Sequence, residues 1–170
     1  MKFKPAFVVI LALLLGLTGT AWAQRAVDDP DWKESEVPPP PAFDVSKLIT
    51  FDVSLNSSLV YGVDPASIRI ADSDSVVRYV MVATSASGAR NVMYEGIRCS
   101  TGEYKTYARY SPDGRWNMVA NAEWRTMFGN MPSKHALRFA KAGACDSAAP
   151  VSSVHALVTR LKNPFFRTTE

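Results

Sequence analysis

The feature that most constrains the fold is a series of short segments, between residues 51 and 119, that are separated by turn residues. Phe51 and Val53 alternate with Asp52 and Ser54, as in a strand with one buried face. The sequence Ser-Pro-Asp-Gly at 111–114 is typical of a tight turn, because proline presets φ and glycine supplies a positive φ. The predicted strands cover residues 51–55, 59–63, 67–70, 76–84, 90–99, 103–110 and 115–119. Successive strands joined by short turns indicate an antiparallel meander.

Segment 76–84 is apolar on both faces except for Arg78, which predicts a central strand covered on both sides. Burial of an unpaired guanidinium is costly, so Arg78 needs either a carboxylate partner or a position at the end of the strand. With the next turn centred on Ser87, Arg78 lies nearly opposite Glu95 or Gly96. We therefore predict a structural ion pair between Arg78 and Glu95, with a ligand-binding arginine as the alternative.

Aromatic residues on these strands suit either a core or a platform for a glycan or peptide. In segment 103–110, strict alternation puts Tyr104, Thr106, Ala108 and Tyr110 on one face and Glu103, Lys105, Tyr107 and Arg109 on the other. We expect most of the aromatic residues to pack in the core, and Tyr107 to be the exposed one.

Beyond residue 119 the hydrophobic period changes to that of helices. A first helical face comprises Ala120, Trp124, Met127 and Phe128 and ends at Gly129, and residues 133–142 are weakly helical. A C-terminal helix is predicted to begin at Pro150 and to bury Val151, Val154, Val158 and Leu161. This order predicts an α+β fold, an antiparallel β-meander sheet followed by C-terminal helices packed on one face. The single domain is expected to span residues 46–162, followed by a frayed tail at 163–170.

The first 23 residues have the pattern of a secretory signal peptide. Lys2 and Lys4 precede an apolar run at 6–17, and Ala21-Trp22-Ala23 forms a cleavage site. The run is shorter than the ~20 residues of a membrane span, and no later segment approaches that length. We expect cleavage after Ala23 and a periplasmic product without a membrane span, with an extracellular destination left open. Loss of both lysines lowers the net charge from +3 to +1, too little to indicate nucleic-acid binding.

Residues 24–45 form an acidic, proline-rich segment that contains one tryptophan, Trp32. The four consecutive prolines at 38–41 lack N–H donors and favour an extended polyproline II conformation. We expect this arm to be a solvated leader. The alternative is that it lies across the domain or a partner and is held there by Trp32.

Cys99 and Cys145 are the only cysteines, and in an exported chain such a pair predicts a disulfide. Two buried thiols are the alternative. The bridge would close a 46-residue loop and stabilise the fold by about 4 kcal/mol on the chain-entropy model. His135 and His155 lack the spacing of a metal site. We accordingly predict no catalytic, metal or cofactor-binding residues.

Three runs carry a family resemblance: residues 74–79 (DSVVRY), 85–92 (SASGARNV) and 94–99 (YEGIRC), followed by 113–116 (DGRW). They resemble the CNP1-like family of uncharacterised exported proteins, found mainly in beta-proteobacteria, over about residues 31–161. The resemblance implies a cell-envelope location and supports pairing of the two cysteines. This chain departs from the family in the Ala144-Cys145-Asp146 setting of its second cysteine, where an aromatic-Cys-Pro sequence is usual, and in having no lipid-acceptor cysteine after the signal.

No motif in the chain identifies a reaction. The sequence has no G-x-S-x-G, S-x-x-K, C-x-x-C or phosphate-binding loop. We therefore expect a non-enzymatic domain that binds an envelope protein or a cell-wall component. The alternatives are an unrecognised periplasmic enzyme, such as a cell-wall hydrolase, and a lysozyme-inhibitor-like protein.

Overall fold

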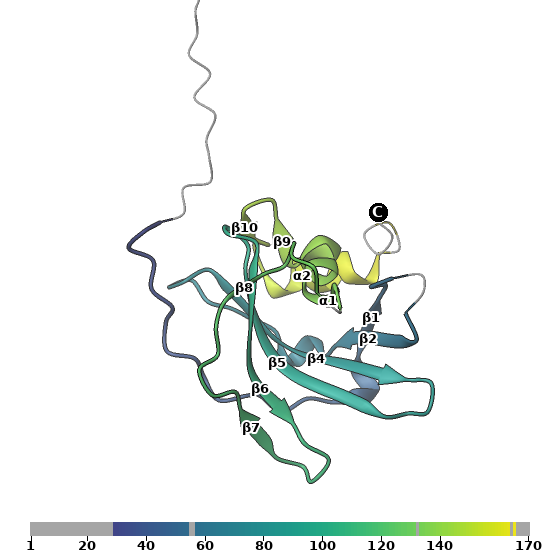
Figure 1. The fold of residues 1–170 in the computed structure, drawn as a ribbon. Coiled ribbons are helices and arrows are strands. Elements are labelled where there is room, and N and C mark those ends of the chain that lie inside the picture. Colours follow the sequence, from purple (N-terminus) through teal and green to yellow (C-terminus); the bar gives the residue numbers. More distant parts are fainter. Residues whose placement is uncertain (1–28, 55–56, 132, 164, 166–170) are drawn as a thin grey trace, which may run out of the picture.

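The computed structural model describes residues 29–54, 57–131, 133–163 and 165. In that part of the chain, eight strands form one antiparallel sheet (Figure 1). Its order is β1 (Ile49–Phe51), β2 (Leu59–Val63), β4 (Val76–Ser85), β5 (Arg90–Arg98), β6 (Glu103–Tyr110) and β7 (Trp116–Met118). Two short strands lie off this path: β3 (Arg69–Ile70) pairs with β4, and β8 (Arg125–Thr126) pairs with β6. The predicted signal peptide, Leu55 and most of the predicted tail lie outside the described residues.

The predicted meander and the central position of segment 76–84 are confirmed, but the first strand covers Ile49–Phe51 and ends where the predicted strand 51–55 was to begin. Residues 76–83 of β4 are buried without exception, because β2 and β5 flank the strand and both faces of the sheet are covered. Two short 3-10 turns accompany the first strands: η1 (Val45–Lys47) precedes β1, and η2 (Pro65–Ser67) connects β2 to β3. Each begins after an aspartate, Asp44 or Asp64, whose carboxylate accepts a backbone N–H of the turn.

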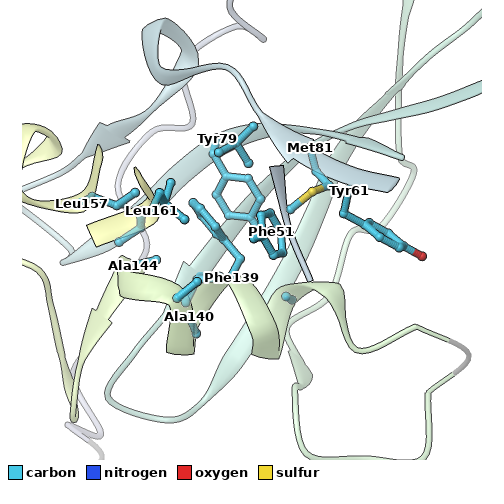
Figure 2. Packing of buried hydrophobic residues seen from close by; sticks show 14 of the residues in the cluster. Phe51, Tyr61, Tyr79, Met81, Phe139, Ala140, Ala144, Leu157 and Leu161 are labelled. Atoms are coloured by element: carbon cyan, nitrogen blue, oxygen red, sulfur yellow. The ribbon is translucent and has the colours of Figure 1, made fainter. Parts of the chain in front are cut away.

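Helices cover one face of this sheet, as the sequence predicted (Figure 1). They are α1 (His135–Phe139), which runs into a π-helical turn η3 (Ala140–Ala144), and α2 (Val154–Lys162). In the core that they form with the sheet, the Phe139 ring lies 4.4 Å from Tyr79 and 5.5 Å from Phe51, between centroids (Figure 2). Leu157 and Leu161 of α2 are completely buried in the same core. The chain is therefore an α+β protein with its helices on one sheet face.

Cys99 and Cys145 are joined as expected, with their sulfur atoms 2.01 Å apart. The bridge links the end of β5 to the short strand β9 (Cys145–Asp146), which pairs with β10 (Ala149–Pro150). It thus holds the helical C-terminal part on the sheet.

Two details of the helical prediction are wrong. Residues 120–128 form no helix: Arg125 and Thr126 pair with β6 as β8, and Phe128 is 67% exposed. The last helix begins at Val154 rather than Pro150, because the Ser153 side chain accepts the Ala156 N–H and so caps the helix. Strand pairing and a better cap outweigh the local hydrophobic pattern in these segments.

The expectation of a solvated arm is also wrong for the described residues. The segment from Trp32 to Leu48 crosses the face of the sheet opposite the helices (Figure 1). Val37, Phe43 and Leu48 pack against the buried side chains of that face. The Phe43 ring meets Tyr110 and Trp116 edge-on, with centroids 5.1 and 5.9 Å away. The extended arm therefore acts as the second covering layer of the sheet.

Candidate functional site

A β-bulge in β6 decides which side chains reach each face of the sheet. Tyr94 pairs with Ala108 but the next residue, Glu95, pairs with Thr106, so Tyr107 is the extra residue. Directly paired residues share a face, and Arg109 pairs with Met93, which belongs to the helix-side core. The bulge therefore turns Arg109 to the helix side, opposite to the face that strict alternation predicts.

The face of the sheet that the segment from Trp32 to Leu48 covers is called the arm side here. On this face, Arg78 is buried against two acidic residues. Its guanidinium lies 2.7 Å from the Asp74 carboxylate and 3.6 Å from Glu34, and the Arg78 and Asp74 side chains are at most 2% exposed. Asp74 also accepts hydrogen bonds from the backbone N–H and hydroxyl of Ser35, at 2.9 and 2.6 Å. Burial by itself would raise the pKa of Asp74, but hydrogen bonds from Arg78 and Ser35 outweigh it and hold the pKa at about 2.

Glu34 of the arm also accepts hydrogen bonds from three side chains beyond the arm. Its carboxylate accepts hydrogen bonds from the Tyr107 hydroxyl at 2.6 Å, Lys105 Nζ at 2.8 Å and Trp124 Nε1 at 3.3 Å. Burial, with the bond to Glu34, raises the pKa of Tyr107 strongly. The prediction of an exposed Tyr107 is wrong: the residue is 3% exposed, and its ring occupies the space beside Gly96, which has no side chain.

Trp32 completes the attachment of the arm. Its indole N–H donates to the Asp74 carbonyl at 3.0 Å, and its ring lies edge-on to Trp124, with centroids 5.8 Å apart. The Arg98 guanidinium lies 3.9 Å from the Trp32 ring centroid, a cation–π distance. The structure therefore shows the alternative arrangement, in which the arm lies across the domain and Trp32 holds it there.

The predicted Arg78–Glu95 ion pair is wrong. Arg78 pairs in register with Gly96, so Glu95 lies opposite Tyr79, and neighbouring residues of a strand point to opposite faces. Glu95 faces the helices, where it is completely buried and accepts hydrogen bonds from Tyr79 Oη at 3.2 Å and Thr106 Oγ1 at 3.0 Å. The two charged residues thus belong to separate polar clusters, one on each face.

The third partner of Glu95 is His135 of α1, whose Nε2 lies 2.9 Å from the carboxylate. Burial lowers the pKa of His135, but the charge and hydrogen bond of Glu95 outweigh this, and the net shift is upward from 6.5. On its other side, His135 Nδ1 lies 3.0 Å from Ser133 Oγ, which in turn donates to Tyr61 Oη at 3.1 Å. The sequence alone does not indicate this cluster, because Glu95 and His135 are 40 positions apart and meet only through packing of α1 on the sheet.

Serine, histidine and carboxylate in series are the groups of a hydrolase triad. Here the histidine is 6% exposed and the glutamate is completely buried, with three side-chain donors on its carboxylate. The cluster therefore links β4, β5, β6 and α1 across the core. In chemical terms, the Glu95 carboxylate favours the protonated form of His135 inside the fold.

Two surface hollows are relevant to binding, and the first adjoins this cluster through Tyr104 and Thr106. The first, of about 150 Å³, is polar and lies beside β6, and its lining includes Tyr104, Thr106, Arg109, Asn121 and Arg125. The second, of about 420 Å³, lies between the β4–β5 and β6–β7 turns and is lined by Phe43, Val45, Arg90, Val92, Tyr110 and Pro112, among others. Among the described residues, no three His, Cys, Asp or Glu side chains are grouped to hold a metal ion.

Within the same residues, none of the helices has the length and apolar character that crossing a membrane requires. The model of the CNP1-like family matches residues 27–162, a range that includes the arm. A protein of Neisseria gonorrhoeae named Cryptic neisserial protein 1 is 28% identical over 149 residues, which cover 78% of this chain and 72% of that protein. No solved structure matches the chain.

Proposed function

The chain belongs to the CNP1-like family, and on that premise we propose that it is an exported protein of the bacterial cell envelope that binds a partner and catalyses no reaction. The observation that supports this proposal most is that ionisable side chains of the two polar clusters are buried and paired with one another. His135 and Glu95 are buried and bonded to one another, and Asp74 and Arg78 are buried and paired on the opposite face. These groups hold secondary structure together, since internal partners use their hydrogen bonds.

The Cys99–Cys145 bridge supports the export part of the proposal, because disulfides persist in oxidising compartments. Cell fractionation tests the location, and N-terminal sequencing of the recovered protein tests cleavage after Ala23. A product in the cytoplasm with its first 23 residues intact would contradict this part.

The 420 Å³ hollow supports the binding part. Its lining is apolar and aromatic, with Phe43, Val92 and Tyr110, and one cationic side chain, Arg90, is exposed at it. A concave, mainly apolar surface with few polar groups is the usual form of a binding site. A protein segment or a cell-wall component that offers an apolar group next to an anionic one suits this hollow.

Site-specific photo-crosslinking in intact cells tests the partner. The photoreactive residue is placed at Pro112, on the rim of the hollow, and at Thr159, an exposed control position on α2. We expect one discrete adduct from position 112 that is absent from position 159, and muramidase digestion distinguishes a cell-wall adduct from a protein adduct. No adduct from position 112, or identical adducts from both, would count against this surface.

The Ser133–His135–Glu95 series favours one alternative, a hydrolase that acts on cell-wall or ester substrates. Turnover of peptidoglycan and model esters, compared between the wild type, Ser133→Ala and the exposed control Ser152→Ala, separates the two functions. We expect no turnover from any of the three. Activity lost only in Ser133→Ala would establish the enzyme, and a direct lysozyme-inhibition assay of the same protein tests the inhibitor alternative.

A further inference from the structure

The polar hollow beside β6 has no part in the proposed function above. Two arginines, Arg109 and Arg125, line it together with Tyr104, Thr106 and Asn121. Both arginines are exposed, and neither forms an ion pair with a carboxylate of the described residues. Every ion pair of the buried clusters uses other cations: Arg78, Lys105 and His135. Two arginines therefore line the hollow, and no carboxylate of the described residues forms an ion pair with either of them.

Two irregular features of the chain bring these arginines to one place. The bulge at Tyr107 turns Arg109 to the helix side, the side of Tyr104 and Thr106. Strand β8 pairs Arg125 with Tyr104, so these two side chains share that face as well. Bulges often re-aim a side chain next to a binding site. Without the bulge, Arg109 would lie on the arm side, and without β8, Arg125 would lie in a loop.

The chemistry of the lining favours an anion with one charge. Guanidinium groups bind carboxylates through paired N–H donors, and two of them can hold both oxygens of one carboxylate. The amide of Asn121 adds a neutral donor. Glu123 also lines the hollow, so its three charged side chains sum to +1, from two arginines and one glutamate. That balance suits a monoanion and disfavours a dianionic phosphate.

We propose that this hollow binds the carboxylate group of a small molecule or of a peptide end, held between Arg109 and Arg125. The volume of about 150 Å³ suits a carboxylate on a short stem and is too small for a nucleotide. This inference is independent of the proposed partner surface, because the two hollows have no lining residue in common. Failure of either proposal leaves the other standing.

The test is an NMR titration of the disulfide-bonded protein as recovered from cells. Sodium acetate is the probe, sodium phosphate the comparison, and sodium chloride keeps the ionic strength constant. We expect acetate to shift the side-chain Nε–H signals of Arg109 and Arg125 and the backbone signal of Asn121, with saturation. Phosphate should bind several-fold more weakly.

Arg109→Gln and Arg125→Gln should each weaken acetate binding at least tenfold. Arg115→Gln, which removes an exposed arginine paired with Asp113 on the β6–β7 turn, should leave it unchanged. Both tested arginines are exposed, so the variants should keep the wild-type amide spectrum elsewhere, and two independent variants guard against misfolding of one. Unsaturable acetate shifts, acetate affinity unchanged from the wild type in either glutamine variant, or phosphate binding as tight as acetate binding would overturn the proposal.

Discussion

Replacing Asp74 with asparagine tests whether the arm-side cluster stabilises the fold as its geometry implies. The substitution keeps the shape of the side chain and removes the charge that lies 2.7 Å from Arg78. The pKa of Asp74 is about 2, against 3.8 for the unperturbed group. At 1.36 kcal/mol per unit, the carboxylate form is stabilised by about 2 kcal/mol in the folded protein.

The loss on substitution should be at least as large as that figure. Among the described residues, Arg78 would keep only Glu34, 3.6 Å away, as an acidic partner while it remained buried. Breaking a buried ion pair by removing one partner typically costs about 3–5 kcal/mol. We therefore expect Asp74→Asn to lower the free energy of unfolding by about 2–4 kcal/mol at pH 7. Equilibrium urea unfolding measures this loss, and with a typical slope the midpoint should fall by roughly 1 M or more.

The matched control is Asp113→Asn, whose carboxylate pairs with Arg115 on the surface. It should not move the unfolding midpoint measurably, because solvent screens exposed pairs. A loss of less than about 1 kcal/mol for Asp74→Asn, or a loss no larger than that of the control, would refute the inference that Asp74 offsets the Arg78 charge.

The lowered pKa of Asp74 also predicts how the free energy of unfolding depends on pH. The folded pKa of Asp74 is lower than the unfolded value, so its contribution is complete above about pH 3.8 and is lost as the pH falls through about 2. The advantage of the wild type over Asp74→Asn should shrink over that window. Because Ser35 bonds to the same carboxylate, trypsin should also cleave faster after the exposed Lys33 in the variant.

The remaining predictions concern the glycine under Tyr107, the disulfide and His135. A Cβ at Gly96 would overlap the Tyr107 ring, so Gly96→Ala should lower the free energy of unfolding by about 1–3 kcal/mol, measured in urea. The double variant with Tyr107→Leu should lose less free energy of unfolding than the two single variants together. A Gly96→Ala variant as stable as the wild type would contradict this. Replacing Cys99 and Cys145 together with alanine should remove up to about 4 kcal/mol, by release of the 46-residue loop, and an unchanged thermal midpoint would argue against the bridge. The positive charge of Arg109 lowers the pKa of His135, so Arg109→Gln should raise it in an NMR titration, whereas Arg115→Gln should not. Because the folded pKa of His135 lies above 6.5, its stabilising contact with Glu95 is complete below pH 6.5, and the contribution is lost as the pH rises through the folded value.

Local pattern determined the framework of this protein. The alternation of apolar residues and the turn sequences predicted the strands at 59–63, 76–84, 90–99 and 103–110 within one or two residues of β2, β4, β5 and β6. Such patterns succeed because a strand with one buried face repeats every two residues, and because glycine and proline mark turns. The cysteine pair was predictable for another reason, since a chain with only two cysteines admits one intramolecular bridge.

Tertiary structure decided the polar clusters and the role of the arm. The bulge at Tyr107 places Arg109 on the opposite face of the sheet from the one predicted. The register of β4 and β5 pairs Arg78 with Gly96, so Arg78 and Glu95 lie on opposite faces and have different partners. The face that a side chain occupies changes when the strand register shifts by one residue. The sequence pattern of one strand does not show how that strand aligns with its neighbour. The acidic, proline-rich composition of the arm resembled that of a solvated segment. It lies on the sheet because Glu34 and Trp32 meet buried donors and acceptors that come from 40 to 90 residues away. Local sequence was enough to predict the long strands β2, β4, β5 and β6, because their patterns repeat within each strand. Which charged residues meet depends on strand register and on packing between distant segments, and these appear only in the folded structure.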